Sequence, residues 1–223
     1  MKLALLLSGG KDSVYSGYLA KKSGHELVCA ITIFSKNKYS YMFHTPSIEK
    51  TKLQAKSMNL PIIIQKTSGK KESELKDLEK AILEAKQKYK IDGIITGAIQ
   101  SVYQSSRIQK ICNKLNLECF NPLWKTDEEK YLNDLIKNKF KIILTGVFAY
   151  PLDEKWLGRK IDKKFVEDIM KMNKKYKISM IGEGGEYETF VLNCPLFKKE
   201  LKIESFKDFK EGENSFRREI EIK

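Results

Sequence analysis

Near its start the chain combines, in one short stretch, the groups that usually bind phosphate. Ser8–Ser13 reads Ser-Gly-Gly-Lys-Asp-Ser and so unites two glycines, an ammonium, a carboxylate and two hydroxyls. The apolar run Leu3–Leu7 before it is typical of a buried strand, and Val14–Ala20 after it is typical of the first turns of a helix. Glycines let backbone N–H groups approach an anion closely, and a helix N-terminus stabilises negative charge. The stretch therefore predicts a site for a phosphate-bearing ligand.

The spacing of this stretch differs from the two commonest nucleotide-binding patterns. In the pattern G-x-x-x-x-G-K-[ST] the lysine is followed by a hydroxyl, whereas here Asp12 follows Lys11. The G-x-G-x-x-G spacing of dinucleotide folds is also absent. The loop therefore indicates a phosphate chemistry other than the γ-phosphate transfer that accompanies the first pattern.

A second stretch with chemical potential lies near the other end of the chain. Gly182–Val191 reads Gly-Glu-Gly-Gly-Glu-Tyr-Glu-Thr-Phe-Val and carries three carboxylates. If Glu186 and Glu188 lie on a strand, their side chains point to one face and that of Tyr187 to the other. Together with Glu183 in the glycine turn, they suit a cationic ligand. A solvated hairpin with ordinary surface acids would have the same pattern.

Strand and helix patterns alternate along most of the chain and predict how these stretches are held. The strand patterns are uniformly apolar, which is typical of strands buried on both faces of a parallel sheet. The predicted strands span residues 3–7, 27–34, 61–64, 93–97, 119–124 (a short strand and a loop) and 141–147. The predicted helices begin after residue 13, at Thr45-Pro46, at residues 75 and 108, and after a capping box of Thr126 and Glu129. We therefore predict an α/β fold, a parallel sheet with helices on both faces.

The carboxyl ends of parallel strands form one edge of the sheet, and ligands of such folds bind there. This rule brings together Ser8–Ser13, Phe34–Ser35 and Gly97–Gln100. After Tyr150 the pattern changes to a loop, one helix and short strands. We therefore predict a nucleotide-binding domain over residues 1–150 and a smaller, substrate-binding α+β region over residues 151–223.

Composition narrows the class of protein. The chain has 223 residues, of which 41% are hydrophobic and 32% charged, as in globular proteins with a real core. No apolar run is long enough to span a membrane and no signal-peptide pattern precedes the first strand. The four cysteines form no C-x-x-C pair, which argues against a zinc ribbon or a dithiol redox motif. We therefore expect structural cysteines and a cytoplasmic protein.

The formal net charge of +13 fits an RNA partner or an acidic protein surface. The lysines are, however, spread through every predicted helix, and such surfaces also accompany thermophily. The net charge alone therefore does not show whether the partner is RNA or an acidic protein.

Ser8–Ser13 resembles the pyrophosphate loop (PP-loop) of the ATP pyrophosphatase superfamily, whose members have the adenine nucleotide alpha hydrolase-like fold. The resemblance implies that ATP is split between its α and β phosphates. A nucleophile then takes the adenylyl group and pyrophosphate leaves. Backbone N–H groups and hydroxyls of the loop would cradle pyrophosphate, Lys11 would neutralise its charge, and Asp12 would hold a bridging Mg²⁺. The implied ATP-binding residues are Ser8, Gly9, Gly10, Lys11, Asp12, Ser13, Phe34, Gly97 and Ala98.

Further motifs, in their order along the chain, resemble the diphthine–ammonia ligases (diphthamide synthases) in their short form. The resemblance spans residues 1–197, and the acidic glycine stretch is its most distinctive part. The motifs are Tyr41–His44, Gly97–Ile99 with Tyr103, Gln104 and Arg107, Pro122–Trp124, Trp156–Arg159 and Gly182–Val191.

The resemblance implies an ATP-dependent ligase that converts diphthine on translation elongation factor 2 to diphthamide. The diphthine carboxylate would form an acyl-adenylate, and ammonia would displace AMP. Diphthine carries a trimethylammonium group, which calls for carboxylates and aromatic faces. The implied catalytic residues are Lys11, Asp12, Glu183 and Glu186. The implied substrate-binding residues are His44, Tyr103, Gln104, Arg107, Glu183, Glu186, Tyr187 and Glu188.

Two other functions remain open at this point. A tRNA-modifying adenylating enzyme of the same superfamily fits the basic charge, although the missing cysteine pairs argue against its thiolating branch. A non-catalytic ATP-binding protein is disfavoured by the intact Lys11 and Asp12 and by the acidic cluster. The nitrogen source, for which we expect free ammonium, and the oligomeric state, a homo-oligomer included, also stay open.

Overall fold

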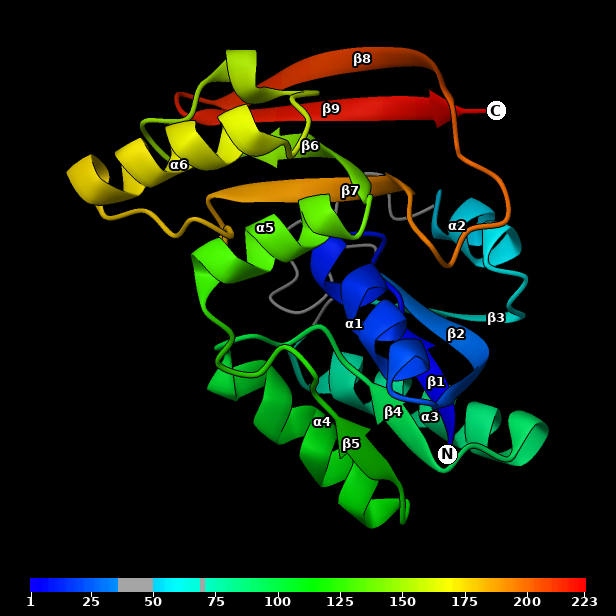
Figure 1. Cartoon of the computed structure of the whole chain (residues 1–223). Coiled ribbons are helices and arrows are strands. Elements are labelled where there is room, and N and C mark those ends of the chain that lie inside the picture. Colours follow the sequence, from blue (N-terminus) through cyan, green and yellow to red (C-terminus); the bar gives the residue numbers. More distant parts are fainter. Residues whose placement is uncertain (36–49, 69–70) are drawn as a thin grey trace. The chain divides into compact units, whose positions relative to one another are not determined.

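The computed structural model describes residues 1–35, 50–68 and 71–223, and it divides into two compact units, Met1–Trp124 and Lys125–Lys223 (Figure 1). Two features of the sequence analysis lie outside the described residues: the motif Tyr41–His44, which includes the proposed substrate-binding residue His44, and the helix start at Thr45-Pro46. Each unit has its own sheet.

The first unit contains a five-stranded parallel sheet in the order β3-β2-β1-β4-β5, which confirms the predicted fold class. Its strands are β1 (Lys2–Leu6), β2 (Glu26–Ser35), β3 (Ile62–Thr67), β4 (Gly93–Ile95) and β5 (Glu118–Phe120). Its helices are α1 (Lys11–Lys22), α2 (Thr51–Ser57), α3 (Lys71–Tyr89) and α4 (Val102–Lys114). The chain builds outward from β1 through β2 to β3 and then returns to the other side of β1 with β4. The strand order therefore reverses between β1 and β4, which is where such sheets bind ligands.

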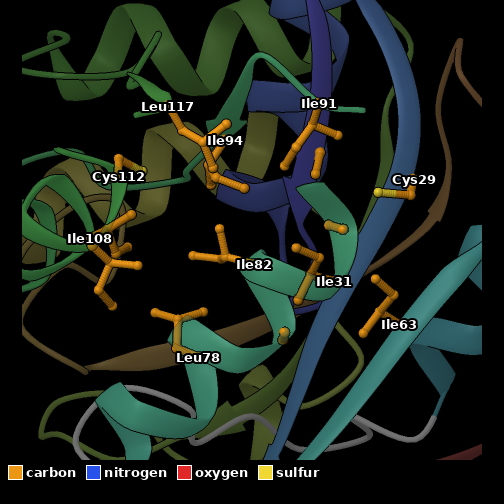
Figure 2. Close-up of a cluster of buried hydrophobic side chains, with 14 of the residues drawn as sticks. Cys29, Ile31, Ile63, Leu78, Ile82, Ile91, Ile94, Ile108, Cys112 and Leu117 are labelled. Carbon is orange, nitrogen blue, oxygen red and sulfur yellow. The ribbon is translucent and has the colours of Figure 1, made fainter. Parts of the chain in front are cut away.

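Helices cover both faces of this sheet. On one face Leu78 and Ile82 of α3 and Ile108 of α4 pack in one apolar cluster with Ala4 of β1 and with residues of β2, β3 and β4 (Figure 2). Successive side chains of a strand point to opposite faces, so the fully buried neighbours of Ala4 point the other way. That second face is covered by α1, which packs on β1, β2 and β4.

The second unit contains a four-stranded antiparallel sheet in the order β7-β6-β9-β8. Its strands are β6 (Lys141–Val147), β7 (Tyr187–Asn193), β8 (Ile203–Gly212) and β9 (Ser215–Ile222), and its helices are α5 (Glu128–Lys137), the 3₁₀ turn η2 (Glu154–Trp156) and α6 (Lys163–Tyr176). This confirms the predicted α+β character of the C-terminal region.

The place of β6 corrects the sequence analysis. Its apolar pattern suggested a sixth strand of the parallel sheet, but β6 pairs antiparallel with β7 and β9. All but the first of its residues are buried, so its pattern is that of a central strand in either kind of sheet. The boundary between the compact units consequently falls after Trp124, and not at residue 150.

The start of α5 also differs from the prediction. The capping box of Thr126 and Glu129 does not form, because Asp127 is the N-cap and its carboxylate accepts the Lys130 N–H at 2.8 Å. Aspartate caps a helix at least as well as threonine, and the shift makes Glu128 the first helical residue.

Within the part of the chain that the structure describes, no helix combines the length and apolar character needed to cross a membrane.

Candidate active site

The predicted phosphate loop lies where the strand order of the first unit reverses. The chain leaves β1 at Leu6, and α1 begins at Lys11 with Gly10 as its N-cap. Gly9 has φ +90°, a backbone conformation that side chains disfavour. Because Gly10 has no side chain, no side-chain cap covers the N–H groups at this helix start. The loop therefore has the backbone geometry of an anion site.

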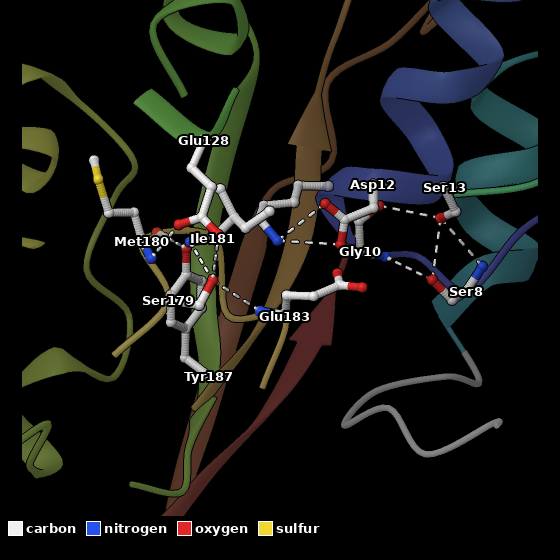
Figure 3. A network of polar contacts seen from close by, with 11 residues as sticks. Ser8, Gly10, Asp12, Ser13, Glu128, Ser179, Met180, Ile181, Glu183 and Tyr187 are labelled. Carbon is white, nitrogen blue, oxygen red and sulfur yellow. Dashed lines mark hydrogen bonds and ion pairs between the residues drawn. The ribbon is translucent and has the colours of Figure 1, made fainter. Parts of the chain in front are cut away.

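Two serine hydroxyls brace the loop from within (Figure 3). The oxygens of Ser8 and Ser13 lie 3.1 Å apart, and the Ser13 hydroxyl also lies 3.1 Å from the Gly10 carbonyl, to which it donates. The Gly10 N–H in turn donates to Ser8 Oγ at 3.4 Å. The structure thus brings together the groups that the sequence proposes for phosphate binding.

Lys11 and Asp12 form an ion pair at the helix start. Lys11 Nζ lies 3.0 Å from Asp12 Oδ1 and 3.1 Å from Oδ2. The lysine side chain is 4% exposed and the aspartate side chain 34%. A buried ammonium is stable only beside negative charge, which the carboxylate supplies and a bound phosphate would increase.

Asp12 fits the predicted magnesium site. Mg²⁺ in nucleotide sites usually takes one or two carboxylates together with phosphate oxygens and water. Asp12 is such a carboxylate, partly exposed and at the rim of an anion-binding loop. The described residues contain no group of three or more potential metal-ligating side chains, so a metal here would depend on the phosphates for its other ligands.

The segment after β4 meets the loop closely. A Cβ on Gly97 would lie 2.8 Å from Ser13 N and 2.9 Å from the Asp12 carbonyl carbon, so only glycine fits. Ala98 follows and is buried, with its N–H donating to Thr96 Oγ at 3.2 Å. Phe34 is half-buried near the end of β2, which pairs with β1. The sheet edge therefore gathers the predicted ATP-binding segments of the first unit.

Tyr103, Gln104 and Arg107 lie in the first two turns of α4, which follows β4 at the same sheet edge. Ser101 caps this helix by accepting the Gln104 N–H at 3.3 Å. The Arg107 guanidinium lies 3.4 Å from the centre of the Tyr103 ring, so the two side chains form one stacked surface.

Gln54, a residue of α2, supports the phosphate loop although no sequence motif marks it. Its side chain is completely buried, and Nε2 donates to the Gly9 carbonyl at 3.0 Å. Thr32 of β2 supports the strand end in a similar way, because its buried hydroxyl donates to the Leu7 carbonyl at 2.8 Å. These contacts join residues far apart in sequence, so no local sequence pattern predicts them.

We predict that Gln54→Leu destabilises the protein by about 1–2 kcal/mol, because leucine has a similar size but leaves the Gly9 carbonyl without its donor. Denaturant unfolding measures this loss. Gln109→Leu is the matched control, since the Gln109 side chain donates to Asn113 Oδ1 along the exposed surface of α4. Equal unfolding free energies for both variants would contradict the role of Gln54.

The acidic stretch of the second unit forms a tight turn that leads into β7. Gly182 has φ +72°, and a Cβ there would lie 2.8 Å from the Tyr187 carbonyl. Glu183 and Glu186 in the turn and Glu188 in β7 are all half-buried. These are the three carboxylates of the sequence prediction, and all belong to one turn and its strand.

Glu186 has two different carboxylate oxygens. Oε1 accepts the Ser179 N–H at 2.8 Å, whereas Oε2 is buried and has no hydrogen-bond partner. A buried carboxylate oxygen without a donor is unfavourable unless a cation lies against it. This oxygen therefore favours a cationic ligand at the turn over the alternative of a solvated hairpin.

Tyr187 differs from its prediction as a substrate-binding residue. Its side chain is buried, its hydroxyl donates to the Met180 carbonyl at 2.6 Å, and its ring packs edge-on against Phe165. The side chain therefore holds the turn from the core side, opposite the face expected for a ligand.

Two further residues that no sequence motif marks, Glu128 and Ser179, organise the turn (Figure 3). Glu128 Oε1 accepts the Ser179 hydroxyl at 3.0 Å, and Oε2 accepts the Met180 N–H at 2.8 Å. Ser179 Oγ accepts the N–H groups of Ile181 and Glu183, both at 3.3 Å.

Arg159, part of another motif, forms a structural ion pair. Its Nη2 lies 2.5 Å from Asp168 Oδ2, and its guanidinium lies 4.4 Å from the centre of the Trp156 ring. The hydrogen bond from Arg159 holds the pKa of Asp168 below its usual value.

Because the folded-state pKa of Asp168 is lowered, its contribution to stability is present above the unfolded pKa and is lost as the pH falls through the folded one. We predict that Asp168→Asn lowers the free energy of unfolding at pH 7 by less than about 1 kcal/mol, and that the difference shrinks in strongly acidic solution. Urea unfolding over this pH range measures it, with the exposed Glu167→Gln on the same helix as control. A difference that grows on acidification would contradict the ion pair.

The cysteines show no catalytic arrangement. All four are free thiols, and burial raises the pKa of Cys29 and of Cys194 to about 12. Cys112 and Cys119 share a hydrogen bond that raises the pKa of Cys112 and lowers that of Cys119. Since a thiolate is the reactive form, Cys29 and Cys194 are inert near neutral pH.

Family models match both units. The model described as diphthamide synthase N-terminal domain matches residues 1–119, and the one described as diphthamide synthase C-terminal domain matches residues 127–222. The chain is 34% identical to curated proteins named diphthine–ammonia ligase from Bos taurus and Homo sapiens, with 92% of this chain and 84% of each relative covered. A solved structure described as a predicted subunit of a tRNA methyltransferase from Methanocaldococcus jannaschii is 19% identical, with a TM-score of 0.42 and coverage of 90% of this chain and 99% of that one.

Proposed function

The chain belongs to the diphthamide synthase family, and we propose that it is an ATP-dependent ligase that amidates diphthine on translation elongation factor 2 to give diphthamide. The observation that carries this proposal is the coverage of the relatives named diphthine–ammonia ligase. Their similarity extends over 92% of the chain, and the matches to the family models over residues 1–119 and 127–222 include both the phosphate loop and the acidic turn.

The first unit would supply the ATP chemistry. The N–H groups of Gly9 and Gly10 and the hydroxyls of Ser8 and Ser13 would hold the departing pyrophosphate, and the buried Lys11 would neutralise its charge. Phe34, Gly97 and Ala98, at the same sheet edge, would border the nucleotide. Asp12 would hold Mg²⁺, which when bound offsets further negative charge on the phosphates.

Activation is needed because a carboxylate is a poor electrophile. In the proposed reaction a diphthine carboxylate oxygen attacks the α-phosphorus of ATP, and the bond to the bridging oxygen of pyrophosphate breaks. The resulting acyl-adenylate has AMP as a good leaving group. Ammonia then attacks the acyl carbon, AMP departs, and loss of one proton leaves the neutral amide.

The second unit would recognise the trimethylammonium group of diphthine. This cation has no N–H to donate, so its best partner is a carboxylate oxygen that needs no hydrogen bond. Glu186 Oε2 is buried without a hydrogen-bond partner and has this property. Glu183 and Glu188 would add negative charge beside it.

We assign the remaining site residues of the first unit more broadly. The stacked Tyr103 and Arg107, with Gln104 beside them, would contact the substrate. His44 keeps its proposed role in substrate binding, and it lies outside the described residues.

The modified factor works in translation, so the proposed site of action is the cytoplasm. Free ammonium is the proposed nitrogen donor.

The net charge of +13 keeps a tRNA-modifying adenylating enzyme as the second candidate. The thiolating branch of that chemistry is disfavoured because burial raises the pKa of Cys29 and Cys194 and no C-x-x-C pair is present.

Incubation with ATP, Mg²⁺, ammonium and diphthine-bearing elongation factor 2 separates the two candidates. We predict AMP release together with the mass change of a carboxylate converted to an amide on the factor. AMP formation with tRNA, and none with the factor, would overturn the ligase in favour of the second candidate.

We predict that Glu186→Gln lowers kcat/KM for the diphthine-bearing factor by about 100-fold, because the amide keeps the contact with Ser179 but removes the charge that faces the cation. ATP binding, measured by calorimetry, should change by less than about twofold. Glu213→Gln is the control, since Glu213 lies in the exposed turn between β8 and β9. Loss of ATP binding in Glu186→Gln, or equal kinetics for both variants, would contradict the role of Glu186.

A further inference from the structure

Glu128 is the first residue of α5, and both of its carboxylate oxygens are bound by the start of the acidic turn. We propose that Glu128 is a positioning residue: it fixes the Ser179–Met180 segment and thereby sets where Glu183 and Glu186 present their charge. The inference rests on the proposed function, because it assigns these two carboxylates to the trimethylammonium group of diphthine.

The direction of the hydrogen bonds makes Glu128 the origin of the network. An ionised carboxylate can only accept hydrogen bonds, so the Ser179 hydroxyl must donate its single hydrogen to Glu128 Oε1. Both lone pairs of Ser179 Oγ then face the N–H groups of Ile181 and Glu183, at 3.3 Å each. Without the carboxylate, the hydroxyl could rotate and the backbone of Glu183 would lose a fixed acceptor.

A second branch of the network reaches Glu186. The Ser179 N–H donates to Glu186 Oε1 at 2.8 Å, while the next N–H, that of Met180, donates to Glu128 Oε2 at 2.8 Å. Two successive N–H groups thus hold one carboxylate each. Because Oε1 of Glu186 accepts this hydrogen bond, Oε2 is the oxygen left without one and the one that would face the proposed cation.

The bonding of Glu128 also shows why it positions the site and is not itself a ligand. Its two oxygens accept hydrogen bonds from the Ser179 hydroxyl at 3.0 Å and the Met180 N–H at 2.8 Å, whereas Glu186 has one oxygen without a hydrogen bond. Nearby like charges raise each other's energy, so the acids need donors that keep their spacing. A rigid supporting shell of this kind decides whether charged groups hold a ligand within about 0.5 Å of the productive place.

The test compares Glu128→Ala and Glu128→Gln with the control Glu129→Gln. Glu129 is exposed and lies in the same first turn of α5, so its substitution removes the same charge from the helix N-terminus without touching the turn. For Glu128→Ala we expect the KM for the diphthine-bearing factor to rise about tenfold, with the KM for ATP unchanged. Glu128→Gln should show a smaller rise, because its amide keeps one acceptor, and the control should match the wild type.

A purely structural role would give a different result. General destabilisation lowers the fraction of active enzyme and hence kcat and the thermal midpoint, but it leaves KM unchanged. A lower kcat with an unchanged KM for the factor in Glu128→Ala would therefore overturn the inference.

Hydrogen exchange gives a readout that is independent of activity. The amides of Met180 and Glu183 should exchange at least about tenfold faster in Glu128→Ala than in the wild type or in Glu129→Gln. If the wild type fails to amidate the factor, the proposed function is wrong, and the exchange experiment still judges the positioning. Equal exchange in Glu128→Ala and the wild type overturns the positioning whatever the activity.

Discussion

The buried ammonium of Lys11 is the constraint on which the first unit depends. A charge whose side chain is 4% exposed is stable only with anionic and dipolar partners around it. The sheet determines where Lys11 lies, since α1 follows β1, and β1 and β4 are neighbours at the point where the strand order reverses. Gly97 lets the segment after β4 come within contact distance of the first turn of α1. The Asp12 carboxylate pairs with the ammonium, and a pyrophosphate group would strengthen this balance of charge.

In the second unit the charges that must be stabilised are negative. Glu183 and Glu186 in the glycine turn and Glu188 in β7 lie close in sequence, and neighbouring carboxylates repel one another and need hydrogen-bond donors. The Ser179 N–H donates to Glu186, the Met180 N–H donates to Glu128 of α5, and the Tyr187 hydroxyl ties the Met180 carbonyl to the core. The result is a turn in which Glu186 keeps one oxygen that no hydrogen bond satisfies. A cation without N–H groups is the ligand that such an oxygen suits.

The parts that could be predicted from the sequence are those that local pattern determines. The glycine loop, its strand and its helix are contiguous, so this strand–loop–helix unit could be located from spacing alone. The acidic turn could be located in the same way. By contrast, the partner of β6 depends on residues 187–193 and 215–222, and its apolar pattern fits a parallel or an antiparallel sheet equally well. Gln54 and Glu128 act across 45 and 51 residues of sequence, and only the fold reveals their contacts. The burial of the Tyr187 side chain could not be predicted, because alternation tells which side chains share a face but not which face meets the core.

The central claim, that the diphthine carboxylate is activated as an acyl-adenylate, is tested most directly with ¹⁸O. A diphthine-bearing elongation factor 2 labelled with ¹⁸O in that carboxylate is amidated by the enzyme with unlabelled ATP, and the phosphate products are analysed by mass spectrometry. The account predicts that the label appears in AMP, because the attacking carboxylate oxygen stays on the α-phosphorus when ammonia displaces it. Label in inorganic phosphate or pyrophosphate, or amide formation with unlabelled AMP, would contradict it.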